Sequence, residues 1–317
     1  MKRTRVCDLL NIDYPIIQGG MTWIANAELA AAVSNAGALG VISPNAAAQA
    51  TDSYAENLRY QIARVRELTD KPFGVNFPVL DTPKEMVDIA IQEGVRVVTT
   101  SAGNPATYTR YLKDAGIKVL HVVASVRHAK KAEAEGVDAV IAEGYEAGGH
   151  NGLDELPTFV LVPQVVDVVK IPVVAAGGIA DARGFVAALA LGAQGVQMGT
   201  RFVATRECIA HQNFKQAILE AIDTGTTITG RKLGPTRGLK NELTAKMVEM
   251  ESRSDSAEEL LSFLGWGRAR GGQLEGDLVE GELYCGAIAG MILKISSAAE
   301  VVQSIVGGYT KVLSRLG

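Results

Sequence analysis

Two glycine-rich stretches, about twenty residues apart, are the part of this chain best suited to binding a ligand. Pro172–Ile179 and Gly195–Phe202 each contain an apolar run that stops in glycine, and the second adds the hydroxyl of Thr200. Bare backbone N–H groups at the ends of two neighbouring parallel strands can hold a phosphate. A single stretch of this kind is more simply a tight turn, but the pair together with Thr200 predicts a phosphate site.

A third glycine-rich segment, Glu143–Gly152, carries the best candidate for acid–base chemistry. It has four glycines in ten residues, which is costly in chain entropy and argues against a mere packing role. His150 lies in this loop, and an imidazole can donate or accept a proton near neutral pH. We therefore predict that His150 is functional, whereas Glu143 either bonds a ligand or ties down the loop. The other histidines are expected to be structural or at the surface: His121, His128 and His211.

Polar groups follow several other apolar runs. In Gln18–Trp23, Gly19 and Gly20 would let a flat ring approach the backbone, and Gln18 and the peptide groups offer hydrogen bonds. Asn76 supplies an amide that both donates and accepts, and Gln197 either points inward or fills the core. The sequence contains neither metal-ligand spacing nor a nucleophile with an adjacent base. The demanding chemistry is therefore expected to belong to an organic cofactor.

The elements that position these residues alternate between short apolar strands and amphipathic helices, which predicts a parallel sheet. Helical patterns include Ala27–Ala36, Ser53–Leu68 and Asp181–Leu191. Eight strands are expected to begin near Pro15, Leu39, Pro72, Val95, Lys118, Asp138, Pro172 and Gly195. This count predicts a (β/α)8 TIM barrel, with an open doubly wound sheet as the alternative. In such barrels the functional groups follow the strands, and phosphate commonly binds after strands 7 and 8.

The pattern changes after Phe202. Residues 205–284 are mostly charged and helical in pattern, with Asn241–Glu251 and Ser256–Leu264 as helices. We predict a small helical cap domain over residues 205–289, inserted after strand 8, and a barrel formed by residues 1–204 and 290–317. The last helix, Ala298–Leu316, is expected to return to the barrel wall. A cap in this position would cover the mouth of the barrel and exclude water.

Composition narrows the class of protein further. The 317 residues are 47% hydrophobic and 21% charged, with a net charge of -4, as in an ordinary globular protein. Aromatic residues are only 5% and no basic stripe occurs, which argues against a nucleic-acid partner. No apolar run is long enough for a membrane span. Cys7, Cys208 and Cys285 are scattered, so we expect a reduced, cytoplasmic protein without a bound metal.

The motifs together resemble a superfamily of FMN-dependent barrel flavoenzymes that comprises enoyl-acyl-carrier-protein reductase II and the class I nitronate monooxygenases. The resemblance covers essentially the whole chain and is carried by Pro15–Trp23, Asp70–Asn76, Ala142–His150, Ala175–Asp181 and Met198–Phe202. It implies that the FMN phosphate lies on Gly177, Gly178, Gly199 and Thr200. It places the flavin ring against Gly19, Gly20 and Met21, with Asn76 and Glu143 holding it, and the predicted cofactor site also includes Gln18, Gly148, Gly149 and Gln197. His150 would face the substrate.

The resemblance leaves two reactions open. In a reductase, NADH or NADPH reduces FMN, and hydride then passes to a 2-enoyl thioester in fatty acid synthesis while His150 polarises its carbonyl. In a nitronate monooxygenase, an alkyl nitronate such as propionate 3-nitronate reacts with the flavin and O2. Glu146–Gly152, Thr99–Pro105 and Glu275–Gly281 look reductase-like, whereas Ser43–Asn45 and Pro235 depart from that pattern. We predict the reductase, acting on a small-molecule or acyl-carrier-bound substrate.

A third hypothesis is a non-catalytic barrel that binds a phosphorylated ligand as a sensor or scaffold. The presence of His150 together with all the loop glycines argues against it. A homodimer is compatible with such a barrel, but no motif in the sequence requires one.

Overall fold

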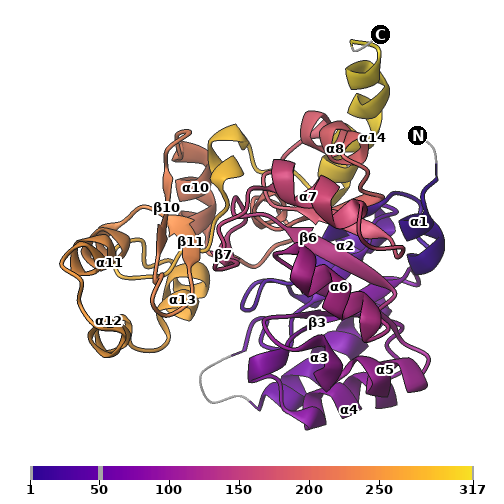
Figure 1. Ribbon diagram of the computed structural model, residues 1–317, viewed down its shortest axis with the longest axis horizontal. Coiled ribbons are helices and arrows are strands. Elements are labelled where there is room, and N and C mark those ends of the chain that lie inside the picture. Colours follow the sequence, from indigo (N-terminus) through magenta and orange to yellow (C-terminus); the bar gives the residue numbers. More distant parts are fainter. Residues whose placement is uncertain (1–2, 49–52, 316–317) are drawn as a thin grey trace.

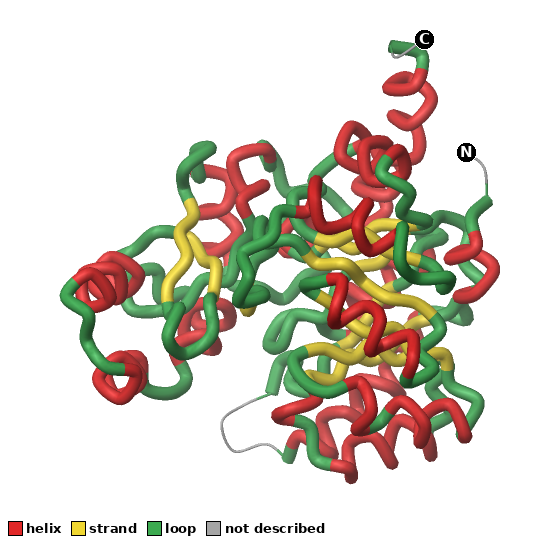
Figure 2. Tube along the Cα trace, viewed as in Figure 1, coloured by secondary structure: helices red, strands yellow, loops and turns green. Residues whose placement is uncertain are grey.

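The computed structural model describes residues 3–48 and 53–315 and shows a barrel of eight parallel strands surrounded by helices (Figures 1 and 2). The strand order is β1-β9-β8-β6-β5-β4-β3-β2. The ring closes between β1 and the residue before β2, because Ile17 and Leu39 form a parallel bridge and Gln18 N donates to Leu39 O at 2.9 Å. The predicted TIM barrel is therefore confirmed. Its strands are β1 (Ile16–Gln18), β2 (Gly40–Ile42), β3 (Phe73–Pro78), β4 (Val97–Ser101), β5 (Lys118–Val123), β6 (Ala139–Glu143), β8 (Val173–Ala176) and β9 (Gly195–Met198).

Alternation along each strand divides the core into two layers. Ile17, Leu120 and Ile141 belong to the cluster that fills the barrel, whereas their neighbours Ile16 and Val140 pack toward the helices. Successive side chains of a strand point to opposite faces, and here both faces are buried. This explains why the strands read as nearly continuous Val, Ile and Ala runs.

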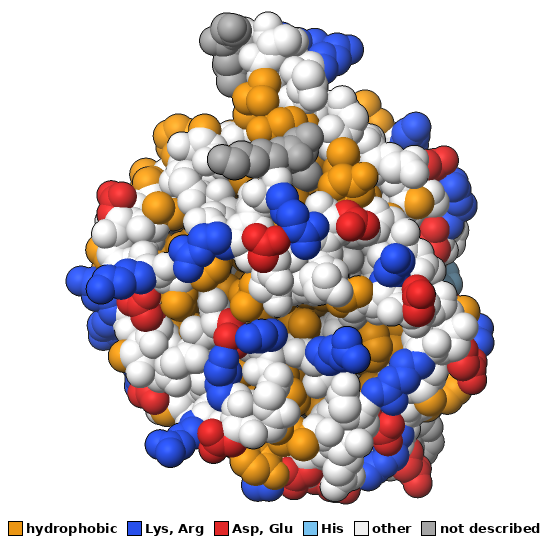
Figure 3. Space-filling view, turned by 90° about the vertical axis from the view of Figure 1, so that its right-hand side faces the viewer, with side chains coloured by type: hydrophobic (Ala, Val, Ile, Leu, Met, Phe, Trp, Pro, Cys, Tyr) orange, Lys and Arg blue, Asp and Glu red, His pale blue; other side chains and the backbone are white. Residues whose placement is uncertain are grey.

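Helices cover the barrel on the outside and at its amino-terminal end. Those of the wall are α2 (Ala27–Asn35), α3 (Tyr54–Leu68), α4 (Lys84–Gln92), α5 (Thr109–Asp114), α6 (Val126–Ala134), α7 (Thr158–Val166) and α8 (Ala182–Ala190), with 3-10 turns η1 (Val79–Asp81) and η2 (Pro105–Thr107). The short helix α1 (Arg5–Leu10) places Val6 and Leu10 in the inner cluster and so closes the bottom of the barrel. Figure 3 shows this end of the molecule, where Lys and Arg are interspersed with Asp and Glu.

Side-chain caps explain where several helices begin. Ser53 accepts from Glu56 N at the start of α3, and Asp181 accepts from Arg183 N at the start of α8. Such oxygens satisfy N–H groups that have no partner within the helix. The final helix α14 (Ala298–Leu313) packs against α8 and α2, as predicted. Among the described residues, no helix is both long and apolar enough to cross a bilayer.

The segment after β9 contains the predicted helices and also a small sheet that the sequence did not indicate. Its helices are α9 (Thr200–Val203), α10 (Gln212–Glu220), α11 (Glu242–Ser252), α12 (Ala257–Leu264) and α13 (Arg268–Arg270), followed by a π turn η3 (Gly271–Glu275) and a 3-10 turn η4 (Ala287–Met291). The strands β10 (Thr226–Thr229) and β11 (Thr236–Leu239) form an antiparallel hairpin. Each strand is short and half-exposed, so its sequence lacks the alternating apolar pattern that would indicate a strand. We propose that residues 205–289 form a cap domain beside the barrel (Figure 1).

The hairpin joins the cap to the barrel. Strand β11 also pairs with β7 (Gly149–His150), a two-residue strand in the loop after β6, with Thr236 opposite His150. The cap therefore holds the backbone of the loop that carries the candidate catalytic histidine. We therefore expect that a movement of β11 would also move the backbone of His150, because the two strands are paired.

Candidate functional site

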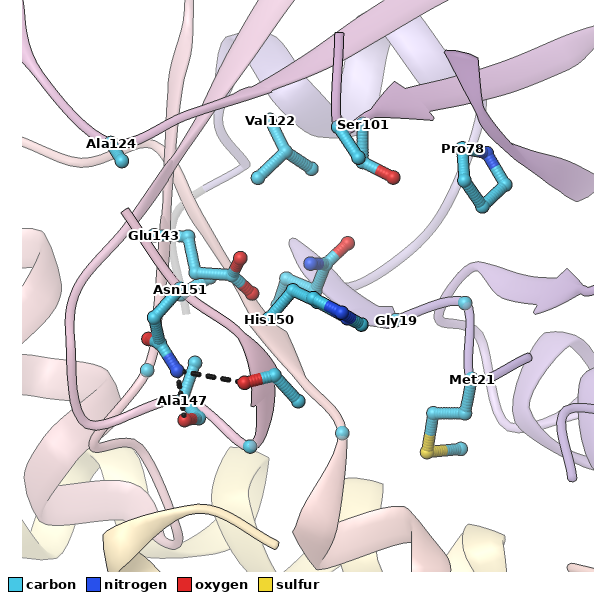
Figure 4. A pocket seen from close by; sticks show the side chains of 18 of the residues that line it. Gly19, Met21, Pro78, Ser101, Val122, Ala124, Glu143, Ala147, His150 and Asn151 are labelled. Carbon is cyan, nitrogen blue, oxygen red and sulfur yellow. Dashed lines mark hydrogen bonds between the residues drawn. The ribbon is translucent and has the colours of Figure 1, made fainter. Parts of the chain in front are cut away.

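A cavity of about 1010 Å³ lies at the carboxyl ends of the barrel strands (Figure 4). Its wall includes the segments after β1, β3, β4, β5, β6, β8 and β9, and Leu233, Gln273, Tyr284, Gly286 and Ile288 of the cap side. Every predicted site residue except Gln18 lines this cavity. The structure thus brings together residues separated by up to about 180 positions in the chain.

The two predicted phosphate loops lie side by side, because β8 and β9 are neighbours. Gly177 and Gly178 have φ of 87° and 71°, a left-handed conformation that favours glycine. A side chain at Gly199 would meet only Met21 Sδ, at 3.8 Å, so the space in front of this residue is open. Thr200 Oγ1 accepts from Gly286 N at 2.9 Å, and its hydroxyl also hydrogen-bonds to the Cys285 side chain.

The loop after β1 allows other strand ends to approach closely. A Cβ atom at Gly20 would overlap with Asn76, and one at Gly19 would lie 3.1 Å from the side chain of Gln197. Thr99 Oγ1 donates to Asn76 Oδ1 at 2.9 Å, which orients the amide. Among the residues that the structure describes, no acceptor contacts Asn76 Nδ2. This nitrogen is therefore free to donate to a ligand in the cavity.

Gln18 is not placed as predicted. Its side chain is fully buried and pairs with the backbone of Val41, with Val41 N donating to Oε1 at 3.0 Å and Nε2 donating to Val41 O at 3.1 Å. It does not line the cavity. Both ends of the amide are used to join β1 to β2, so the side chain has a structural role.

The loop that carries His150 is held by several polar contacts. Asn151 Nδ2 donates to Ala147 O and Gly149 O at 3.0 and 2.9 Å. Glu146 accepts from Thr158 N and Oγ1, both at 2.9 Å, and so fixes the start of α7. Gly149, with φ of 82°, turns the chain so that β7 can form. These contacts make Glu146 and Asn151 supports of the loop.

His150 extends into the cavity from this loop (Figure 4). Its ring meets the edge of Tyr284 with 5.9 Å between ring centroids. Burial of the surrounding site lowers the pKa of His150 below its ordinary value of 6.5, although Asp81 acts in the opposite direction. This direction favours the neutral imidazole, with one nitrogen able to donate and the other able to accept, although the residue keeps an exposed surface. Tyr284 comes from the cap side and was not among the residues predicted for the site.

Glu143 ends β6 and also points into the cavity (Figure 4). Within the described ranges, no donor contacts its carboxylate, and desolvation raises the pKa of Glu143 to about 7. A carboxyl group with such a pKa is uncommon outside functional sites. His121, in contrast, is buried and bonded through Nδ1 to Thr100 Oγ1 at 2.7 Å, and burial lowers its pKa to about 4. His121 is thus the core histidine that was predicted, although it borders the cavity.

The titration of Glu143 has a consequence for stability. In the unfolded chain the group ionises near its ordinary value of 4.5, and in the folded protein near 7. Between these values the folded state keeps a proton that the unfolded state has lost, so stability falls as pH rises, by up to roughly 3 kcal/mol. We expect Glu143→Gln to remove this loss: the flavin-free variant should gain stability over wild type at pH 8 and little at pH 4. Urea unfolding at both pH values measures it, and an equal difference at the two pH values would contradict it.

Comparison with known proteins agrees with this geometry. The family model described as nitronate monooxygenase matches residues 3–308. The solved structure of FabK from Thermotoga maritima superimposes with a TM-score of 0.90 at 45% identity, covering 100% of this chain and 99% of that one. A probable nitronate monooxygenase of Staphylococcus saprophyticus is 39% identical over 78% of this chain and 81% of its own length.

A third relative points to thioesters. It is the (3aS,4S,5R,7aS)-5-hydroxy-7a-methyl-1-oxo-octahydro-1H-indene-4-carboxyl-CoA dehydrogenase of Mycobacterium tuberculosis, 35% identical over 96% of this chain and 95% of that protein. The resemblance stated from the motifs is confirmed by these matches.

Proposed function

Because the chain belongs to the nitronate monooxygenase family of oxidoreductases, we propose that it is an FMN-dependent reductase of 2-enoyl thioesters that uses NADH or NADPH. The observation that carries the proposal is the similarity to FabK, an enoyl-acyl-carrier-protein reductase II, over the full length of both chains at 45% identity. The CoA-thioester dehydrogenase among the relatives supports a thioester substrate.

The cavity suits FMN in size and in the kind of groups it offers. At about 1010 Å³ it is as large as the larger known ligand sites. We propose that the phosphate binds to the backbone N–H groups of Gly177, Gly178, Gly199 and Thr200; the open space in front of Gly199 supports this. The ring would lie against Gly19, Gly20 and Met21, with Asn76 Nδ2 as a donor to it. FMN, when bound, supplies the hydride chemistry that no side chain of the site can perform.

The residues of the chain would bind and polarise the substrate. A neutral His150 can donate a hydrogen bond to the thioester carbonyl and stabilise the negative charge that develops on its oxygen. Glu143, with a pKa of about 7, can exist in either protonation state near neutral pH and so can hold a proton beside the reacting atoms. Residues of the proposed cap, among them Leu233, Gln273 and Tyr284, line one side of the cavity and would restrict water there, which would strengthen both interactions.

The alternative function is a nitronate monooxygenase, favoured by the relatives that carry this name at 35–39% identity. In that case His150 would bind the nitronate anion or act as a base on the neutral nitroalkane. Three free, buried cysteines support the further proposal that the enzyme works in the reducing cytoplasm.

An anaerobic experiment separates the two reactions. The purified protein with bound FMN is mixed with NADH or NADPH and the flavin absorbance is followed, and crotonyl-CoA is then added. A reductase should be bleached within the turnover time and reoxidised by the thioester. A flavin that stays oxidised with both nucleotides, in a protein that consumes O2 with propionate 3-nitronate, would show the monooxygenase. A purified protein that is colourless and refuses FMN would instead favour the non-catalytic barrel.

A further inference from the structure

We infer that Arg127, His128 and Lys131, on α6, form a second anion site that binds a phosphate group carried by the second substrate. This inference rests on the proposed function, because it names which part of a nucleotide or thioester is recognised. Two substrates of the proposed reaction carry such phosphates: the dinucleotide has a diphosphate, and a phosphopantetheine thioester has a phosphate ester.

The three side chains line the same cavity as the predicted flavin site but belong to another part of its wall. Helix α6 follows β5, which pairs with β6, and β6 pairs with β8. The segment with Glu143 and His150 therefore lies between the phosphate loop after β8 and the basic residues of α6. Gly152 packs on Ala124 just before α6, so the His150 loop directly adjoins them. A ligand held by its phosphate at α6 can extend toward the reacting centre.

The charges of the cavity are unevenly distributed. Arg127 and Lys131 are the only Lys or Arg residues among the described ones that line it, and the flavin phosphate loops offer backbone N–H groups instead. The acidic lining residues are Asp81, Glu143 and Glu146. In the part of the chain that the structure describes, none of these forms an ion pair with the cations of α6. An anion entering this cavity thus meets positive side chains at one place.

Arg127, His128 and Lys131 are exposed, and Lys130 on the same helix likewise forms no ion pair among the described residues, so it is their position on the cavity wall that distinguishes the three from Lys130. Arg64 pairs with Glu28 and Glu67, and Lys113 pairs with Asp138. No ion pair of Arg127, His128 or Lys131 occurs within residues 3–48 and 53–315. At the end of the barrel away from the cap, positive and negative side chains alternate over the surface (Figure 3). The proposal therefore rests on the convergence of these side chains on one part of the cavity wall.

The order of charges along α6 supports the same reading. Its first turn has no acidic residue and contains Arg127 and His128, whereas Lys131 lies in its last turn together with Glu133. The helix dipole disfavours a cation in the first turn, so the position of Arg127 costs some stability in the absence of an anion, while Lys131 is favourably placed. A bound phosphate would compensate that cost. Arg presents paired donors that match phosphate oxygens, and Lys adds a point charge.

The test measures binding rather than turnover. Isothermal titration calorimetry of the FMN-loaded protein uses three probes: coenzyme A, NADP+ and pantetheine, which lacks phosphate. The double variant Arg127→Gln/Lys131→Gln should bind coenzyme A, NADP+ or both at least about tenfold more weakly, a change of about 1.4 kcal/mol. Pantetheine should bind as it does to wild type. Lys130→Gln is the matched control, because Lys130 is an exposed neighbour on α6 that does not line the cavity.

The outcomes distinguish the two possible ligands and the two proposals. Weaker binding of coenzyme A alone assigns the site to the thioester, and weaker binding of NADP+ alone assigns it to the nucleotide. The proposed site is overturned if the double variant binds both coenzyme A and NADP+ as tightly as wild type does. It is also overturned if Lys130→Gln loses as much affinity as the double variant, or if the wild-type protein binds neither compound. If the double variant loses binding but wild type reduces no thioester, the anion site stands and the proposed reaction fails.

Discussion

Replacing Gly199 by valine is expected to abolish FMN binding in a protein that still folds. The backbone at Gly199 has φ of -103°, which any residue can adopt, and a Cβ atom there would touch only Met21 Sδ at 3.8 Å. The Cβ atom would therefore fit without displacing protein atoms, and the two methyl groups that it carries would reduce the space in front of the backbone. That space is where we propose that the phosphate approaches the N–H groups of Gly199 and Thr200.

The measurement compares flavin content and stability. We expect FMN affinity to fall by at least ~100-fold, or about 2.7 kcal/mol, while the thermal unfolding of the flavin-free protein changes little. Gly307→Ala is the control: a Cβ atom at this position of α14 meets no atom within 4 Å, far from the cavity, and its flavin content should equal that of wild type. A yellow Gly199→Val protein with wild-type affinity would show that the phosphate does not bind there.

The barrel could be predicted because its strands are buried on both faces, and because four of them, β1, β6, β8 and β9, are followed directly by glycine. Such strands produce long apolar runs that the intervening helices separate clearly. The hairpin β10–β11 could not, since its stability comes from pairing with β7, a Gly–His pair more than eighty residues earlier. A two-residue strand leaves no pattern in a sequence, and only the folded chain brings it beside β11.

Alternation explains which polar strand ends reach the cavity. Asn76, Glu143 and Gln197 follow Val75, Ala142 and Val196, which all pack toward the helices, so their own side chains face inward. Gln18 follows Ile17, which points into the barrel, and therefore faces the other way. Alternation along a strand predicts which side chains point into the barrel only when the orientation of one residue in that strand is already known. The residue type alone did not separate Gln18 from the others.

Site residues that come from elements distant in the chain could not be predicted from the sequence pattern. Tyr284 reaches the edge of His150 from the cap side, and Arg127 and Lys131 reach the cavity from the outer wall. Each is ordinary in its local context, as one aromatic residue or two cations on an exposed helix. They become candidate site residues only because α6 and the cap pack around the same cavity.

Replacing His150 by alanine is expected to reduce turnover by ~100-fold or more while FMN remains bound. His150 lies on β7, whereas the predicted phosphate contacts come from the loops after β8 and β9. Its side chain makes a ring contact with Tyr284 and extends into the cavity, so its loss leaves the backbone pairing of β7 with β11 in place. Steady-state kinetics with crotonyl-CoA and flavin content per chain measure the two effects.

A graded series tests whether the imidazole acts through its hydrogen bond. His150→Gln keeps a donor at a similar distance and should retain more activity than His150→Ala, since a fixed donor still stabilises the oxygen that becomes negative. If His150 only shaped the loop, both variants would lose flavin or stability together with activity. Desolvation keeps the pKa of His150 below 6.5, so in the Glu143→Gln variant, which lacks the other group of the site that titrates near pH 7, turnover should not rise as pH falls to 6.5. A histidine that must be protonated would instead give a rate that rises through this range, and that result would contradict the role as a neutral donor.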